Sequence, residues 1–192
     1  MKKIILIASV FLLAVQCSKN QSEPSVSPTQ TKTATTEIST DSLKNYAGET
    51  KKLLVKNLTQ KIEEGGAENA LEFCNIEAMP LTKSMSEKHG LQISRVTDKP
   101  RNSSNLANDE ELKLIEKYKQ QILAGETLAP TRTATHYYEP LVTNAMCLQC
   151  HGEKGKNIQT KTLEKIAQLY PNDLATGYKE NEVRGLISIK TN

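Results

Sequence analysis

The chain of 192 residues contains no tryptophan, and aromatic residues make up only 4% of it. A hydrophobic content of 37% still permits a core, although a lean one is expected. The formal net charge is only +3, and it falls to +1 if a cleaved leader removes Lys2 and Lys3. So weak a charge gives no reason to expect a nucleic acid as a partner. The length and the absence of internal repeats favour one domain with a tail.

Long apolar runs are scarce, and the one that stands out lies at the N-terminus. Ile4 to Val15 follows two lysines and is interrupted only by Ser9. It is too short to span a bilayer comfortably and is typical of a signal peptide. Cys17 comes directly after it, within a stretch that resembles a bacterial lipobox, although Gln16 stands where a small residue is usual. An ordinary cleaved signal with an incidental cysteine is the alternative.

We therefore predict a lipoprotein signal over residues 1–16 and a lipidated Cys17. Acyl chains on this cysteine would anchor an exported protein to a membrane on the periplasmic side. Residues 17–40 are rich in Ser, Thr, Gln, Lys and Pro, which predicts a disordered tether. The folded domain is expected over residues 41–192, beginning at a helix capped by Asp41 or Ser42.

Apolar periodicity and turn residues divide this domain into helices first and strands later. The first helix is expected to end at Gly65–Gly66, and the second at Gly90. Asn108 is expected to cap a third, amphipathic helix. A short helix is expected over 162–170, and strands over 91–96, 133–142 and 183–189. Long insertions separate the strands, so the pattern predicts an α+β fold with antiparallel pairing.

The most informative motif is Cys147-Leu148-Gln149-Cys150-His151. This spacing is typical of covalent c-type haem attachment, in which each thiol adds to a porphyrin vinyl group and the histidine binds the iron. Two cysteines at this spacing would also suit a redox dithiol or half of a zinc site. A zinc site would need a fourth ligand such as Cys74. The motif predicts one covalently bound haem c.

A second axial ligand is missing from the usual place, because neither Met nor His follows His151. This excludes the common small-cytochrome arrangement, in which a ligand methionine lies far downstream of the motif. Met146 is too close along the chain to reach the opposite face of a haem easily. Spacing alone does not choose among the upstream candidates, which are Cys74, Met79, Met85, His89, His136 and Met146. Cys74, which is left without another role, could equally be a buried small hydrophobe.

Several stretches together resemble the DUF3365, or Tll0287-like, family of exported c-type haem proteins. Their order and spacing span about Leu43 to the C-terminus, and they are Leu71–Asn75, Arg95–Asn102, Tyr138–Leu141, Cys147–Gly152, Tyr170–Asp173, Ala175–Tyr178 and Arg184–Gly185. The resemblance implies a PAS-like α+β fold with an antiparallel sheet and flanking helices that enclose the haem. It also implies an uncommon axial pair, His151 and the thiolate of Cys74.

Two further contacts with the haem are expected. Arg101 could form a bidentate pair with a propionate, although a solvated basic loop is the commoner fate of such residues. Tyr137 and Tyr138 alternate along a strand, so only one of the two rings could lie against the porphyrin. Tyr138 is the predicted contact.

These features predict one-electron transfer with an unknown redox partner. The alternative is a haem-based sensor of redox state or of a diatomic gas that works through a separate signalling partner. An enzyme is not expected, because no acid–base pair stands beside the motif, although His136 could supply one half.

Overall fold

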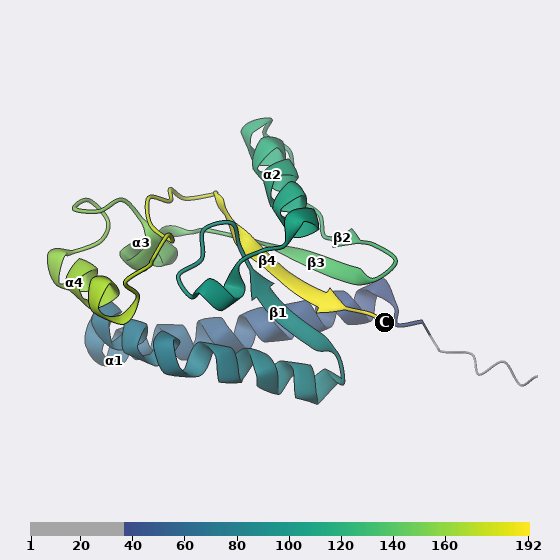
Figure 1. The fold of residues 1–192 in the computed structure, drawn as a ribbon, viewed down its shortest axis with the longest axis horizontal. Coiled ribbons are helices and arrows are strands. Elements are labelled where there is room, and N and C mark those ends of the chain that lie inside the picture. Colours follow the sequence, from purple (N-terminus) through teal and green to yellow (C-terminus); the bar gives the residue numbers. More distant parts are fainter. Residues whose placement is uncertain (1–36) are drawn as a thin grey trace, which may run out of the picture. The chain divides into compact units, whose positions relative to one another are not determined.

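The computed structural model describes residues 37–192, and this part of the chain has an α+β fold (Figure 1). The elements in order are α1 (Thr40–His89), β1 (Gln92–Val96), the 3-10 helix η1 (Ser103–Asn105), α2 (Asp109–Leu123), β2 (Thr131–Arg132), β3 (His136–Val142), α3 (Ala145–His151), α4 (Thr160–Leu169) and β4 (Val183–Lys190). The strands form one sheet in the order β1-β4-β3-β2, and every neighbouring pair is antiparallel. The predicted fold class is therefore confirmed.

The element α1 is a pair of helical arms rather than one continuous rod (Figure 1). The break falls at the predicted glycine pair, where Gly66 has φ 73° and ψ −169°, a conformation open to glycine but not to residues with a Cβ. The arms fold back on each other, so that the rings of Tyr46 and His89 stack with centroids 4.0 Å apart. The helix cap is Ser39 and not Asp41 or Ser42, because the Ser39 hydroxyl accepts the Ser42 N–H.

Two helical elements cover the two faces of the sheet. The α1 arms contribute Leu43, Ala47 and Met85 to a core with Ile93, Tyr137, Ile187 and Ile189. On the other face, α2 contributes Ile115 and Tyr118 to a core with Val96, Ala107, Tyr138, Val183 and Leu186. The expected capping residue of α2 is confirmed, because Asn108 forms a capping box with Glu111. Strand alternation thus sends Tyr137 and Tyr138 to opposite faces.

One expected strand is divided in the structure. Residues 133–142 were expected to form a single strand, but Thr133 to Thr135 form the turn of a hairpin between β2 and β3. The Thr133 hydroxyl accepts the N–H groups of Thr135 and His136, so the turn is closed by a side chain. Threonine has a high strand propensity, and this local hydrogen bonding is what overrides it.

Helices α3 and α4 lie beyond the sheet, at the end of α1 where its arms meet (Figure 1). Helix α4 packs on α1 through a small core made of Leu71, Ile158, Ile166 and Tyr170. Helix α3 follows β3 after a short turn and is capped by Asn144, whose side chain accepts the Cys147 N–H. The CxxCH motif is therefore carried on a helix whose N-terminus is capped by a side chain. Within residues 37–192, no helix is both long and apolar enough to cross a membrane. The predicted signal, Cys17 and most of the tether lie outside the described residues.

Candidate functional site

A cavity of about 270 Å³ lies between α1, α3 and the sheet. Apolar side chains from both arms of α1 form much of its wall, including Leu54, Leu58, Ile62, Ala70 and Leu71. The remaining lining includes four side chains predicted to hold a cofactor and three arginines, which are Cys74, Cys147, Cys150, His151, Arg95, Arg101 and Arg184. The fold thus brings the early cysteine and the late CxxCH motif to one space.

His151 is held in a defined tautomer. Its Nδ1 lies 2.7 Å from the backbone oxygen of Ala175, and because a carbonyl can only accept, Nδ1 carries the proton. The lone pair is then on Nε2, as in a histidine that binds a metal. Burial, together with the nearby charges of Arg101 and Arg184, lowers the pKa of His151 well below 6.5. The imidazole is therefore neutral, which is the form that can act as a ligand.

The two motif cysteines lie one helical turn apart, so both face the cavity from the same side of α3. Burial raises the pKa of Cys150 to about 11, so its sulfur is a protonated thiol near neutral pH. A redox dithiol works through a thiol with a lowered pKa, so the environment of Cys150 does not favour that alternative.

Cys74 enters the cavity from the second arm of α1. Burial raises its pKa, while the positive charges of Arg95 and Arg101 act in the opposite direction. Within residues 37–192, no three His, Cys, Asp or Glu side chains are grouped closely enough to hold a bare metal ion. The cysteines and His151 surround the cavity instead of converging on a point, which does not favour the zinc alternative.

Backbone contacts fix the orientation of the motif. The carbonyl oxygens of His151 and Gly152 accept the N–H groups of Tyr178 and Gly177, at 2.9 Å and 2.8 Å. At Gly152 a Cβ would lie 2.5 Å from the Cβ of Asn157, so only glycine allows this close approach. The loop that precedes β4 is thereby joined to the end of α3.

The hydrogen bonds of the Arg101 side chain are made within the protein. Its Nε donates to Asp173 Oδ1 at 3.0 Å, and an Nη donates to the Cys150 carbonyl at 2.6 Å. Only 10% of the Arg101 side chain and 7% of the Asp173 side chain are exposed. Arg101 therefore ties the haem-type motif to the loop at Asp173, and its carboxylate partner is internal. Arg101 also lines the cavity, and its predicted pairing with a propionate stays a prediction.

Two other arginines reach the cavity without an acidic partner among the described residues. Arg95 donates to the Thr82 hydroxyl and to the Ala78 carbonyl. Arg184 donates through Nη1 to the Thr97 hydroxyl at 2.8 Å, and its Nε is buried with no hydrogen-bond partner. Burial lowers the pKa of both guanidinium groups, and the two charges repel each other. The cavity is therefore suited to a ligand that carries negative charge.

The other residues considered as iron ligands or haem contacts lie in different parts of the fold. Met79 and Met146 line the cavity with Cys74, whereas Met85 is part of the core beneath the sheet. His89 stacks on Tyr46 away from this cavity, and His136 stacks on Tyr138. Tyr138 does not line the cavity, because it packs under α2 on the opposite face of the sheet. Sequence reasoning noted Arg184 only as part of a matching stretch, and that stretch was the one available signal for its role.

The fold and the site define an α+β protein with an antiparallel sheet and a CxxCH motif facing a positively charged cavity. The chain belongs to the Tll0287-like family, which matches residues 15–192. The structure is similar to the crystal structure of the cyanobacterial heme-protein Tll0287, with a TM-score of 0.57. This match covers 80% of this chain and 96% of that chain at 19% identity, so it bears on the fold. No curated protein matched the chain.

Proposed function

We propose that the chain binds one haem c and transfers single electrons outside the cytoplasm. Cys147 and Cys150 would attach the haem covalently, and His151 and Cys74 would bind its iron. The observation that carries the proposal is the His151 ring, fixed by Ala175 with Nε2 free in a cavity that also holds three thiols. Membership of the Tll0287-like family and the structural likeness to a heme-protein support it.

The residues of the cavity fit a covalent porphyrin. Each motif thiol would add its S–H bond across one vinyl group, so the step consumes the protonated form that burial favours at Cys150. The apolar side chains of α1 would cover the apolar faces of the ring. The bound group would supply reversible one-electron chemistry at its iron.

Arg95 and Arg184 fit the charged edge of the same group. A haem carries two propionates, and the cavity holds two guanidinium groups with no acidic partner among residues 37–192. Pairing with a carboxylate would give the buried Arg184 Nε the acceptor that it lacks. We therefore assign the propionates to these arginines, and not to Arg101.

Cys74 suits the role of the second ligand for a physical reason. Coordination deprotonates a thiol, and the nearby charges of Arg95 and Arg101 favour the resulting thiolate. Donation from a thiolate stabilises ferric iron, so the reduction potential is expected to be low. The unpaired state of Cys74 in an exported protein is then explained by ligation.

A haem-based sensor is the second candidate function. Met79 lines the same cavity as Cys74 and comes from the same arm of α1. If the Cys74 thiolate dissociated on reduction, a site for a diatomic gas would open in this cavity. Rapid binding of CO by the reduced protein, with slow electron exchange, would favour sensing. Fast reversible electron exchange without CO binding would favour transfer.

The direct test of cofactor attachment is a pyridine haemochrome spectrum. The full-length chain would be produced together with a cytochrome c assembly system and then denatured. We expect one covalently attached haem per chain, retained in Cys74→Ser and lost in the Cys147→Ser/Cys150→Ser double variant. A wild-type chain that carries no covalent haem under these conditions would refute the proposal.

A further inference from the structure

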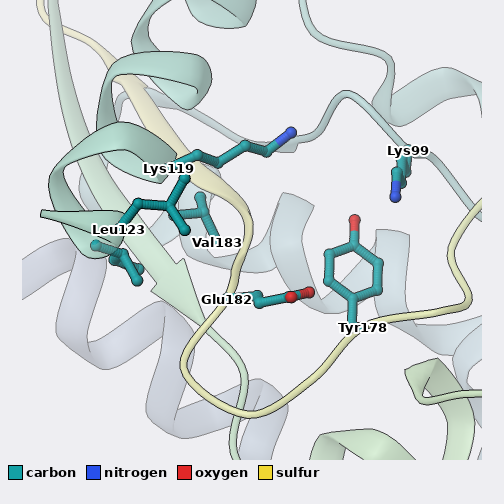
Figure 2. Close-up of a pocket in the computed structure, with 7 residues that line it drawn as sticks. Lys99, Lys119, Leu123, Tyr178, Glu182 and Val183 are labelled. Carbon is teal, nitrogen blue, oxygen red and sulfur yellow. The ribbon is translucent and has the colours of Figure 1, made fainter.

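We propose a second small-molecule site, which takes a monocarboxylate with an apolar body. It is a cavity of about 250 Å³ beside α2, and it shares no lining residue with the cavity that holds the CxxCH motif. Its walls come from α2, from the loop after β1, and from the loop that leads into β4 (Figure 2). The lining residues are Lys99, Lys119, Ile122, Leu123, Tyr178, Glu182 and Val183.

Tyr178 gives the first indication of a ligand. The residue is only 3% exposed, and its buried hydroxyl makes no hydrogen bond of good geometry among the described residues, although Thr97 and Arg184 are its polar neighbours. A buried hydroxyl without a good acceptor is destabilising, so a bound acceptor would remove a penalty. Figure 2 shows the hydroxyl directed to the side where the amino groups of Lys99 and Lys119 lie. Burial raises the pKa of Tyr178, so the hydroxyl remains a donor.

The charges around this hydroxyl select a single negative charge. Lys99 has its Nζ 5.3 Å from the centroid of the Tyr178 ring and has no acidic partner among residues 37–192. The Nζ of Lys119 pairs with Asp98 at 2.5 Å. The carboxylate of Glu182 also lies in the wall and would repel a second negative charge on a ligand. The lining therefore suits a monoanion better than a phosphate dianion.

The rest of the cavity is apolar and selects the body of the ligand. Ile122, Leu123 and Val183 form this part, and Leu123 is 79% exposed at the end of α2. A ligand placed on Leu123 would remove apolar surface from water. A cavity of about 150 Å³ is enough for benzene, so the larger volume here accommodates an aromatic ring with a carboxylate. Benzoate is a suitable probe of this class.

The experiment is a titration of the purified full-length chain with benzoate, followed by calorimetry or by ligand-observed NMR. We expect saturable binding with a Kd of about 1 mM or tighter. Tyr178→Phe keeps the ring and loses one hydrogen bond, so binding should weaken about fivefold. Lys99→Met should weaken it at least about tenfold, since a charge-assisted bond is lost. Lys113→Met, an exposed lysine of α2 outside the cavity, is the matched control and should bind as the wild type does.

A second set of measurements tests whether the site requires an apolar body on the ligand. Benzoate should bind more tightly than acetate, and Leu123→Ser should reduce that difference. Absence of saturable binding would overturn the proposal, as would equal affinity in the Lys99→Met and Lys113→Met variants. Equal or tighter binding of inorganic phosphate that is insensitive to Leu123→Ser would also overturn it, because the cavity would then be only a basic patch. If Tyr178→Phe does not fold, the lysine pair and Leu123→Ser decide. None of these readouts depends on haem.

Discussion

At the scale of single residues, Arg184 supplies one of the buried positive charges that we propose to pair with the haem propionates. We predict that Arg184→Gln lowers the reduction potential of the haem-loaded protein, because a positive charge near the iron favours the added electron. The equilibrium constant for reduction is expected to fall about tenfold, which is about 59 mV for a one-electron couple. Spectroelectrochemical titration measures it. Arg184→Lys keeps the charge and should stay closer to wild type, whereas identical potentials in all three proteins would contradict the role.

How far single residues could be predicted depends on how local their partners are. Cys147, Cys150 and His151 form one contiguous motif on one helical turn, so their shared position followed from spacing. Arg101 has an internal partner, Asp173, 72 positions further along the chain, and no local pattern reveals the course of that loop. The role of Arg184 as a cavity-lining residue was missed for the same reason. Its position in the cavity follows from the packing of β4, which no local pattern reveals.

Tyr138 illustrates a different limit. Strand alternation correctly placed Tyr137 and Tyr138 on opposite faces, but it does not say which helix covers which face. The cavity lies on the side covered by α1, so Tyr138 is directed away from it. A two-residue period assigns relative orientation only, and tertiary packing decides the rest.

At the scale of elements, the helical hairpin of α1 brings Cys74 towards α3, and its turn requires glycine. Gly66→Ala forces a Cβ into a conformation with φ 73° and ψ −169°, and should destabilise the protein by about 1–3 kcal/mol. Gly48, an exposed residue inside the first arm with open space around it, is the matched control. Gly48→Ala should stabilise by roughly 1 kcal/mol, because alanine has the higher helix propensity. Urea unfolding measures both, and equal shifts of one sign would contradict this account of the turn.

The contact between α1 and α4 depends on an acidic residue. Burial raises the pKa of Glu68, but hydrogen bonds from Thr162 and Lys161 outweigh burial, and the net pKa lies below its usual 4.5. A carboxyl whose pKa is lower in the folded state stabilises it above the unfolded pKa, and this is lost as the pH falls. Stability should therefore decline below about pH 5, and less steeply in Glu68→Gln. Unfolding midpoints across that pH range measure it, and parallel profiles would count against the role of Glu68.

Elements were predicted best where a local signal begins or ends them. Gly65–Gly66, Gly90 and Asn108 each act on neighbouring backbone groups, and each ends or caps a helix in the structure. The short elements were missed, namely β2, η1 and the helical form of the motif in α3. They are too short for a periodic pattern, and their conformation depends on side-chain caps and on strand pairing.

At the scale of the whole molecule, the α+β architecture was predictable, because helices in the first half and separated strands in the second leave few alternatives. The assembly of the cavity was not, since it needs the α1 hairpin, α3 and the sheet together. The predicted membrane attachment concerns residues outside 37–192 and stays a prediction.

Cys17→Ala should move the exported protein from the membrane to the soluble fraction, because acyl chains attached there are the expected anchor. Cys74→Ala is the control that should remain membrane-bound, and unchanged fractionation of Cys17→Ala would refute the anchor.

The central claim is a haem held between His151 and the thiolate of Cys74. Its most direct test is the ferric absorption and electron paramagnetic resonance spectrum of the haem-loaded full-length chain, compared with Cys74→Ala and with Met79→Leu as a cavity-lining control. The account predicts a low-spin ferric spectrum in the wild type and in Met79→Leu, and a high-spin spectrum in Cys74→Ala. A Cys74→Ala spectrum that is the same as the wild-type spectrum would contradict it.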